Sequence, residues 1–300
     1  MTGCKAVEIV GRTLKRRGMN TMNTWLITGC SSGLGKSLAN AVLEHGDQAI
    51  ITARTPETVQ LFRERFSQTA LPLQLDVTKE EEVTNTIAKG IERFGKIDVL
   101  VNNAGYCLRG AVEECSFEEI KKQFETNFFG MIRMIQHVLP HMRKQRKGSI
   151  INFSSIAALS TAEGSAFYGA SKCAVEGLSD GLRKEVGPLG IKIMVVEPGP
   201  FKTDFFYRSI AINEHNIEDY KNTAGKRKVR IKNLEDSTMK GWGDNDKAAQ
   251  VIIKAIEDKE SPFHLLLGSV AVQLAEQFFA SRAEEVVKWK NLSIQTDVTL

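Results

Sequence analysis

Short apolar runs alternate with longer helical patterns along most of this 300-residue sequence. Several of the runs end at turn-forming residues, as at Gly29, Asn102 and Pro198. Strands that alternate with helices form parallel sheets covered by helices on both faces. The sequence therefore predicts an α/β fold with a doubly wound parallel sheet of about seven strands, at 25–27, 49–51, 73–75, 97–101, 149–153, 191–196 and 264–267.

The intervening segments repeat apolar residues at helical spacing, as Leu34, Leu38 and Val42 do. Thr55 before Pro56 is typical of a helix start, and Thr78 is expected to cap the next helix. We expect helices at about 33–45, from 56, and at 78–94, 117–143 (interrupted near Gly130 and Pro140), 166–186, 246–258 and 270–289.

No internal repeat or flexible linker divides the chain, so residues 22–300 are expected to form one domain. Residues 201–242 combine aromatic and basic residues without clear periodicity, and we expect an irregular lid insertion there. Residues 1–21 place basic residues after a weak apolar stretch, the reverse of a secretory signal. We expect this segment to be a disordered extension or the product of an upstream start.

Composition excludes several classes of protein. The net charge of +4 comes from 40 basic and 36 acidic residues spread along the chain, so no nucleic-acid partner is expected. Five cysteines without CxxC spacing indicate neither a metal nor a disulfide framework, which favours a reducing, cytoplasmic location. No apolar run reaches the roughly 18 residues that span a bilayer.

A glycine-rich loop joins the first predicted strand to the first predicted helix. Glycines permit a tight turn and close approach of the backbone to a pyrophosphate, and the helix start offers free N–H groups. A three-glycine loop can also be a mere turn, but its position between strand and helix favours a dinucleotide. The candidate residues are Gly29, Ser31, Ser32, Gly33, Leu34 and Gly35.

The end of the second strand bears on the choice of cofactor. Many NAD-binding folds carry an acidic residue there, which bonds the ribose 2′-hydroxyl. Here the position holds Ala53, followed by Arg54. A neutral residue removes repulsion and a guanidinium can pair with a 2′-phosphate, so NADP(H) is predicted to be preferred, with NAD(H) possible. The alternative is that Arg54 is an ordinary surface arginine.

Three residues suggest a catalytic site. Tyr168 and Lys172 stand four apart in a helical segment and share one helix face. Ser155 lies 13 residues before the tyrosine, at the carboxyl end of a strand. Reduction of a carbonyl needs a proton donor, and a nearby ammonium brings the phenol pKa of about 10 toward neutrality. A serine hydroxyl can stabilise charge that develops on the reacting oxygen. YxxxK alone is common by chance, and Ser154 competes with Ser155.

Together with the TGxxxGxG loop and Asn102-Asn103-Ala104-Gly105, this pattern resembles the compact, single-domain short-chain dehydrogenases/reductases, which have a Rossmann-type sheet. The resemblance implies a catalytic tetrad of Asn127, Ser155, Tyr168 and Lys172, in which Asn127 holds a water of a proton relay. It also implies cofactor contacts from Asp76, Val77, Asn103, Ala104, Gly105, Tyr168, Lys172, Pro198, Gly199 and Thr203.

The substrate is less well defined. The stretch 197–205 and the segment 265–268 resemble a bacterial oxidoreductase branch of the family that is similar to retinol and 17β-hydroxysteroid dehydrogenases. Aromatic residues after Pro200 suggest a hydrophobic carbonyl or alcohol substrate, such as a medium-chain carbonyl, steroid or retinoid, or a lid that packs on its own domain. Five basic residues between 226 and 232 are expected to be a solvated surface, or to steer an acidic substrate.

Other readings stay open. An acyl-carrier ketoreductase would usually lack the insertion after Pro200, and a non-catalytic NADP(H)-binding redox sensor would often lack the tyrosine or the lysine. His137 and His141 share a helix face but have no accompanying carboxylate or cysteine, so no metal site is predicted. By resemblance, we expect a homodimer or homotetramer.

Overall fold

The computed structural model describes residues 22–202, 209–232 and 242–298. The predicted extension at 1–21 and the predicted contact Thr203 lie outside these ranges, as does part of the predicted lid. Nearly all of the elements expected from the sequence fall within them.

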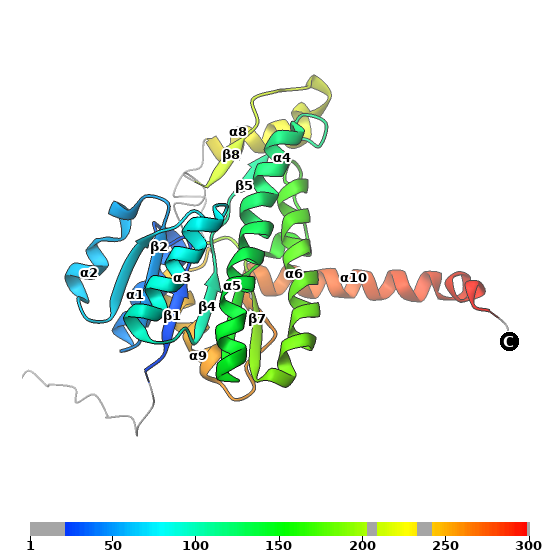
Figure 1. The fold of residues 1–300 in the computed structure, drawn as a ribbon. Coiled ribbons are helices and arrows are strands. Elements are labelled where there is room, and N and C mark those ends of the chain that lie inside the picture. Colours follow the sequence, from blue (N-terminus) through cyan, green and yellow to red (C-terminus); the bar gives the residue numbers. More distant parts are fainter. Residues whose placement is uncertain (1–21, 203–208, 233–241, 299–300) are drawn as a thin grey trace, which may run out of the picture.

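A seven-stranded sheet, parallel throughout, forms the centre of the molecule (Figure 1). Its order is β3-β2-β1-β4-β6-β7-β9. The strands are β1 (Thr24–Ile27), β2 (Gln48–Ala53), β3 (Ala70–Gln74), β4 (Val99–Asn102), β6 (Gly148–Phe153), β7 (Ile191–Pro198) and β9 (His264–Leu267). The chain moves outward from β1 to β3 and then returns to place β4 on the other side of β1. Such a reversal opens a crevice at the carboxyl ends of the two central strands. The predicted doubly wound α/β fold is confirmed.

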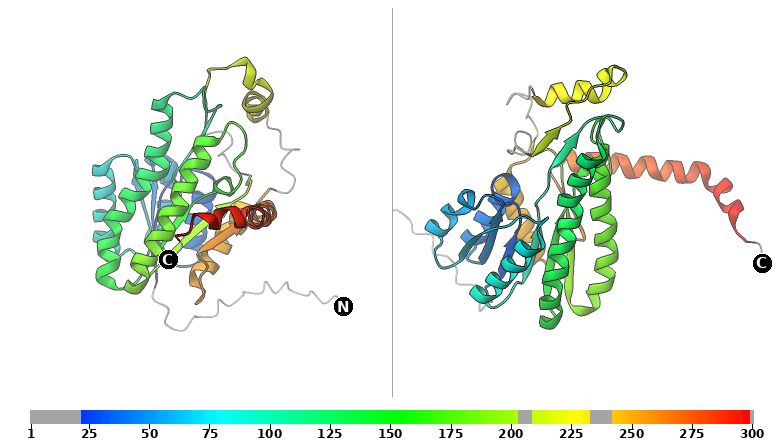
Figure 2. Two further views of the ribbon diagram at one scale, coloured as in Figure 1. Left: turned by 90° about the vertical axis from the view of Figure 1, so that its right-hand side faces the viewer. Right: turned by 45° about the horizontal axis from the view of Figure 1, so that its top comes forward.

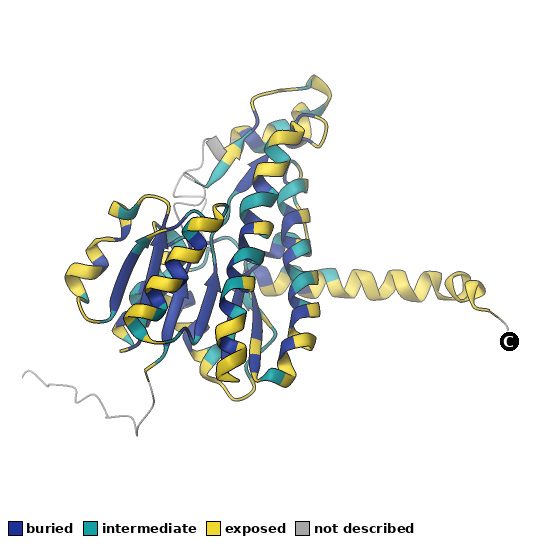
Figure 3. Ribbon diagram, in the orientation of Figure 1, coloured by how far each residue is buried: buried dark blue, intermediate teal, exposed yellow. Residues whose placement is uncertain are grey.

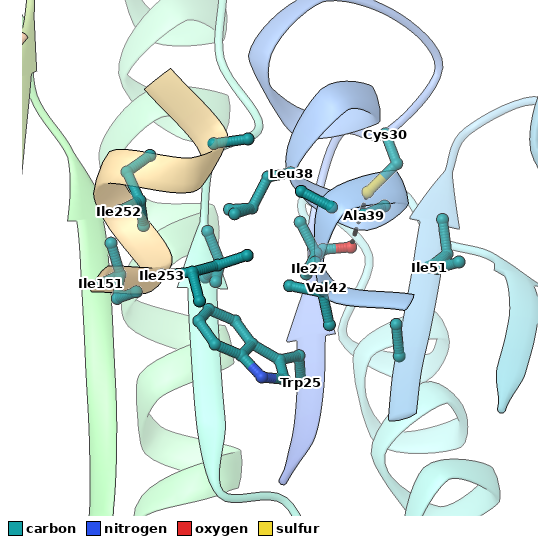
Figure 4. Packing of buried hydrophobic residues seen from close by; sticks show 14 of the residues in the cluster. Trp25, Ile27, Cys30, Leu38, Ala39, Val42, Ile51, Ile151, Ile252 and Ile253 are labelled. Atoms are coloured by element: carbon teal, nitrogen blue, oxygen red, sulfur yellow. Dashed lines mark hydrogen bonds between the residues drawn. The ribbon is translucent and has the colours of Figure 1, made fainter. Parts of the chain in front are cut away.

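Helices cover both faces of the sheet. On one face, α1 (Gly33–Glu44) and α9 (Asn245–Glu257) pack over Trp25, Ile27 and Ile51 (Figure 4). On the other face, α3 (Glu80–Phe94), α5 (Gly130–Gln145) and α6 (Ala166–Val186) pack over Leu26, Ile50 and Ile150. Adjacent residues of one strand thus enter opposite layers, because strand side chains alternate. Two apolar cores hold the strand ends in place.

Several boundaries differ from the sequence prediction. Strand β3 begins at Ala70 and ends at Gln74, so Leu75 follows it. Thr78 does not cap α3; the residue at the N-cap is Lys79, and the Thr78 hydroxyl donates to Asp76 Oδ1 at 2.8 Å. The hydroxyl is therefore already used in the turn before the helix.

The long helical region predicted at 117–143 is divided once. It comprises α4 (Phe117–Phe124), a π-helical turn (Glu125–Phe129) and α5. Pro140 lies inside α5 and does not end it.

The insertion after Pro200 is more regular than expected. It contains β8 (Ile210–Ile212), a 3₁₀ turn (Glu218–Tyr220), a π-helical turn (Lys221–Gly225) and α8 (Lys226–Lys232). Strand β8 pairs in parallel with β5 (Cys107–Arg109), a strand that the sequence did not predict. Both strands have only three residues, too few for a periodic pattern. Figures 1 and 2 show this unit beyond the carboxyl ends of the main sheet.

The prediction of a solvated basic run is wrong for Lys228. This side chain is 5 % exposed, forms a 2.7 Å ion pair with Glu114 and donates to His215 O. Glu114 in turn accepts from the backbone N–H groups of Ala111 and Ile217. The buried pair therefore fastens α8 to the loop that follows β5.

Two short helices and one long helix complete the fold. A 3₁₀ turn (Pro56–Val59) and α2 (Leu61–Arg65) follow β2, with Pro56 at the predicted first helical position. The final helix α10 (Ser269–Ser293) begins against the body and then projects away from it. Its outer part is exposed on all sides, as Figure 3 shows.

Candidate active site

A cavity of about 950 Å³ lies where the strands of the main sheet end. Residues that follow β1, β2, β4, β6 and β7 line it, and the β5–β8 unit closes its far side. The predicted site residues on its wall are Gly29, Ser31, Ser32, Gly33, Leu34, Arg54, Asp76, Val77, Asn103, Ala104, Gly105, Ser155, Tyr168, Lys172, Pro198 and Gly199. Residues far apart in the sequence thus meet around one space.

The glycine loop needs its glycines. Gly29 has a φ of +72°, and a Cβ there would lie 2.9 Å from the Cα of Ala104. A Cβ on Gly35 would collide with the side-chain amide of Asn103 and with Gly29 O. Gly35 therefore lies beneath the loop and keeps it close to β4, whereas Gly33, with a φ of +59°, starts α1 on the cavity wall.

One hydroxyl and one amide join the glycine loop to the end of β4. Thr28 Oγ1 accepts from the backbone N–H groups of Asn103 and Ala104, each at 3.0 Å. Asn103 Nδ2 donates to Thr28 O at 2.9 Å and to Gly29 O at 3.0 Å. Sequence reasoning assigned Asn103 and Ala104 to the cofactor groove but missed Thr28.

A second buried chain of polar groups supports the middle of the sheet. Asn102 Nδ2 donates to Asn152 Oδ1, and Asn152 Nδ2 donates to Ser179 Oγ, both at 2.9 Å. These three side chains connect β4, β6 and α6. They fix the helix that carries Tyr168 relative to the strands that form the crevice.

The far wall of the crevice lies beside β2 and β3. Ala53 is buried at the end of β2, and Arg54 is exposed at the cavity wall. Asp76 Oδ1 accepts from the backbone N–H and the hydroxyl of Thr78, so this carboxylate is partly used by its own turn. The residue that directly follows Ala53 on this wall is therefore a cation, Arg54.

Tyr168, Lys172 and Ser155 meet at the other end of the cavity. The tyrosine and the lysine project from one face of α6, and Lys172 Nζ lies 5.7 Å from the centre of the Tyr168 ring. Lys172 Nζ donates to Phe153 O at 2.7 Å, which anchors it to the end of β6. Ser155, two residues later, forms a side-chain hydrogen bond with Tyr168. A phenol, an ammonium group and a hydroxyl are thus in one cluster.

Burial is the main cause of the pKa shifts of Tyr168 and Lys172. It raises the pKa of Tyr168 well above its usual value, while the hydrogen bond from Ser155 and the positive charge of Arg109 act in the opposite direction. Burial lowers the pKa of Lys172 to about 8, partly offset by the negative charge of Glu176. Near neutral pH, Tyr168 is therefore a phenol beside a cationic lysine.

Asn127 lies behind the cavity rather than on its wall. Its Oδ1 accepts from Tyr106 N at 2.9 Å, and its Nδ2 donates to Tyr106 O at 2.8 Å and to Ser171 Oγ at 3.2 Å. A Cβ on Gly105 would lie 3.2 Å from Asn127 Oδ1 and 3.7 Å from Lys172 Nζ. Gly105 thus lies between Asn127 and Lys172, and a side chain there would crowd Asn127.

Ser154 also lines the cavity, but its hydroxyl donates to the backbone of α6, to Lys172 O at 3.4 Å. Glu176 lies next to this hydroxyl. Glu176, Glu197 and His264 lie together there, with His264 Nδ1 3.5 Å and 3.4 Å from the two carboxylates. Burial raises the pKa of both carboxyl groups, and each is close to the other.

Gly199 is held against the start of α10. Its N–H donates to Leu267 O at 3.0 Å, and a Cβ there would lie 3.1 Å from Ala271 N. Together with Pro198 it forms the part of the wall that follows β7. Thr203, predicted to belong to the same segment, lies outside the described residues.

Sequence reasoning missed the polar residues at the end of the cavity that faces the β5–β8 unit. They are Tyr106, Arg109, Lys122, Ser165 and Arg227. Arg109 is 8 % exposed, and its Nε and Nη1 atoms have no hydrogen-bond partner among the described residues. Its place four residues after Gly105 was visible in the sequence, but no pattern there indicated where the side chain would lie.

Comparison with protein families identifies the chain. Residues 23–211 match the family model described as short chain dehydrogenase, and this match covers more than half of the sequence. The chain belongs to the short-chain dehydrogenase/reductase family. It is therefore a member of an oxidoreductase family.

Two curated members of the family illustrate the similarity. Oxidoreductase BOA17 of Botryotinia fuckeliana is 37 % identical over 276 residues, which cover 90 % of this chain and 97 % of that protein. A 3-ketodihydrosphingosine reductase of Bacteroides thetaiotaomicron is 38 % identical over 244 residues, which cover 81 % of this chain and 87 % of that protein.

Solved structures of family members agree with the fold. A short-chain dehydrogenase from Streptomyces avermitilis has a TM-score of 0.85 at 36 % identity, covering 93 % of this chain and all of that one. ElxO with NADP bound has a TM-score of 0.68 at 31 % identity, covering 84 % of this chain and 99 % of that one. Among the described helices, none is both long and apolar enough to cross a membrane.

Proposed function

We propose that this short-chain dehydrogenase uses NADP(H) to interconvert a carbonyl compound and the corresponding alcohol. The observation that carries the proposal is the cluster of Tyr168, Lys172 and Ser155 at one end of a cavity whose other end is a glycine loop. A proton donor for oxygen and a place for a dinucleotide thus share one cavity.

The walls of the cavity fit a dinucleotide. The bare backbone at Gly29 and Gly33 and the start of α1 would hold the pyrophosphate. Arg54 and the neutral Ala53 would accept an adenosine 2′-phosphate, which favours NADP(H), although NAD(H) can also fit. The binding of NADP by ElxO, a relative 31 % identical to this chain, supports the same choice. When bound, the cofactor supplies or accepts the hydride at the substrate carbon.

Tyr168 acts on the oxygen of the substrate. In carbonyl reduction its phenol gives its proton to that oxygen, and the raised pKa keeps the phenol protonated beforehand. Lys172, held by Phe153 O, remains cationic below its pKa of about 8 and stabilises the phenolate left behind. The Ser155 hydroxyl donates to the same substrate oxygen. For alcohol oxidation the proton moves the other way.

Asn127 and Gly105 would complete a route for the proton. The side chain of Asn127 holds the backbone of Tyr106 by two hydrogen bonds, and Gly105 lies between Asn127 and Lys172. A water molecule held near Gly105 would return a proton to Lys172 and then to Tyr168. Asn127 is therefore assigned a positioning role.

The substrate end of the cavity combines apolar and polar surface. Apolar side chains on its wall include Ile156, Phe201, Ile210, Val270 and Leu274, which favours a fairly hydrophobic substrate. The relative named 3-ketodihydrosphingosine reductase, at 38 % identity, supports a keto substrate.

We also propose that the chain forms a homodimer or homotetramer through the helices after β4 and β6. The surface of α4 and the following turn is unusually apolar, with Phe117 71 % and Phe129 46 % exposed.

The test is NADPH oxidation by the protein with a panel of aldehydes, ketones and quinones, beside the variant Tyr168→Phe. We expect turnover by the wild type and a loss of about 10³-fold in the variant, because general acid catalysis is removed. NADPH should still bind the variant with unchanged affinity. Tyr220→Phe is the matched control, since Tyr220 donates to Glu113 on the outside of the molecule.

Substantial activity of Tyr168→Phe would contradict the assigned role. Tight NADPH binding by the wild type without turnover of any compound would instead favour a non-catalytic NADP(H)-binding protein.

A further inference from the structure

Arg109 is a buried cation, and two of its three guanidinium nitrogens have no acceptor among the described residues. Only 8 % of the residue is exposed, and neither Nε nor Nη1 has a hydrogen-bond partner among the described residues. Buried polar groups are nearly always bonded, and an uncompensated buried charge is strongly unfavourable. Since Arg109 also lines the cavity, its free donors point to a missing anion in that cavity.

The fold holds Arg109 rigidly at this place. Asn213 N donates to Arg109 O at 2.8 Å, and the adjacent Gly110 N donates to Gly164 O at 3.0 Å. On the other side, Leu108 N donates to Gln123 Oε1 at 2.8 Å. The β5 backbone is thus bonded to three other segments. A buried side chain on a backbone that is held in this way has less freedom to lose on binding, which favours affinity.

Arg109 lies near the catalytic cluster and not near the adenosine end. Cys107 and Arg109 fall on the same face of β5, because side chains alternate along a strand. The charge of Arg109 lowers the pKa of Tyr168, and the charges of Arg109, Arg227 and Lys172 together lower that of Cys107, although burial raises both. Arg109 therefore shares its surroundings with Lys172 and Tyr168.

Two other cations near this end, Arg227 and Lys228, have carboxylate partners. Arg227 Nη1 lies 4.0 Å from Glu163 Oε2, and Lys228 pairs with Glu114 at 2.7 Å. Of the cationic side chains on the cavity wall, Lys122 is exposed to solvent. The buried charge that Arg109 offers is that of a single guanidinium, which matches a carboxylate better than a phosphate dianion.

We propose that Arg109 binds a carboxylate of the substrate, so that the protein acts on hydrophobic oxo acids or the corresponding hydroxy acids. This inference rests on the proposed function, because it takes Tyr168 as the group that faces the carbonyl. The apolar side chains Ile156, Ile210 and Leu274 would contact the chain between the two polar groups. The reaction itself is unchanged: hydride goes to the carbonyl carbon and the Tyr168 proton to its oxygen.

The test compares 3-, 5- and 7-oxodecanoic acids with their methyl esters as substrates for NADPH oxidation. The acid and the ester of each pair differ in the charge that Arg109 would bind and, apart from that, in one methyl group. For the carbonyl position that fits the cavity best, we expect kcat/KM of the acid to exceed that of the ester at least about tenfold, because the acid forms a charge-assisted pair with Arg109. Arg109→Met should reduce this ratio to about one.

Arg63→Met is the matched control, since Arg63 is an exposed arginine on α2 away from the cavity. It should keep the ratio of the wild type. Arg109→Met removes an unpaired buried charge and is expected to melt at a higher temperature than the wild type, so loss of the ratio is not a folding defect.

Binding of decanoate to the complex with NADP⁺, measured by calorimetry, gives a readout without turnover. Wild type should bind decanoate at least about tenfold more tightly than Arg109→Met does. If esters and acids are turned over equally, or decanoate binds both proteins equally, the carboxylate site is wrong and the oxidoreductase function stands. If no carbonyl compound is turned over but decanoate binding depends on Arg109, the proposed function is wrong and the anion site stands.

Discussion

The two ends of the cavity differ in whether their polar side chains have hydrogen-bond partners. At the glycine loop, Thr28 and Asn103 use their side chains in hydrogen bonds to the backbone, so the loop is complete without a ligand. At the β5–β8 end, Arg109 and Ser165 each keep a buried polar atom without a partner in the described structure. The comparison indicates that one end is built as a fixed support and the other as a surface that its ligand completes.

The difference also appears in how each end is assembled. The glycine loop and the end of β4 belong to neighbouring strands of the main sheet. The β5–β8 end joins segments about 100 residues apart through a three-residue pairing, Cys107–Arg109 with Ile210–Ile212. Substitutions at the two ends should therefore have separable effects on cofactor and on substrate.

After Tyr168→Phe, the largest expected effect separates chemistry from cofactor binding. Ser155→Ala should lower kcat about 10²-fold, because a donor to the reacting oxygen is lost. The NADPH dissociation constant, measured by fluorescence titration, should change by less than about twofold, since Ser155 contacts Tyr168 and not the glycine loop. Ser154→Ala is the control and should lose much less activity. Equal losses in both variants would mean that the wrong serine is assigned.

The next test concerns the rigidity of the glycine loop. In Gly35→Ala, the new methyl group would displace Asn103 from Gly29 O, so we expect unfolding to become about 2 kcal/mol easier. NADPH should also bind about tenfold more weakly. Gly177→Ala, in α6 with no atom within 4 Å of the added carbon, should instead stabilise the protein by about 0.5 kcal/mol. Denaturant unfolding of both variants measures these changes in the free energy of unfolding. If Gly35→Ala is as stable as the wild type, the loop is not rigid.

Cofactor preference provides a third, smaller effect. Arg54→Ala should raise the KM for NADPH about tenfold and leave that for NADH within about twofold, because only the 2′-phosphate is lost as a partner. Steady-state kinetics with each cofactor at saturating carbonyl substrate give both values. Arg63→Ala controls for net charge. If NADPH kinetics are the same in Arg54→Ala as in the wild type, Arg54 is an ordinary surface arginine.

The smallest expected effect lies beneath the catalytic cluster. Burial raises the folded-state pKa of Glu176, so folding favours its protonated form and stability is lost as the pH rises above the ordinary value of 4.5. Glu176→Gln cannot ionise. Its free energy of unfolding should equal that of the wild type near pH 4 and exceed it by about 1 kcal/mol near pH 8, allowing for partial exposure. Thermal unfolding against pH measures this difference. Glu118→Gln, on exposed α4, should show none, and a constant difference at all pH values would refute the titration.

The sheet, the glycine loop and the helix that carries Tyr168 and Lys172 could be predicted from the sequence. Tyr168 and Lys172 are neighbours because a helix repeats every 3.6 residues, and the strand ends converge because parallel strands end at one edge. The predicted strand positions and the glycine loop follow from equally local patterns. The resemblance to a known family added residues such as Asp76 and Gly199 that no spacing marks.

The substrate end could not be predicted in the same way. Strands β5 and β8 are too short to show alternation, and their pairing depends on a contact about 100 residues apart. Lys228 looked solvated because its partner, Glu114, is distant in the sequence. Whether Arg109 is paired or free depends on what packs around it, which no local pattern records.

The most direct test of the account is a crystal structure of the protein with NADP⁺. We expect the 2′-phosphate beside Arg54, the pyrophosphate against the backbone at Gly29 and Gly33, and the pyridine ring next to Tyr168 and Lys172. A dinucleotide bound outside this cavity, or bound with its pyridine ring away from Tyr168, would contradict the central claim that the two ends form one redox site.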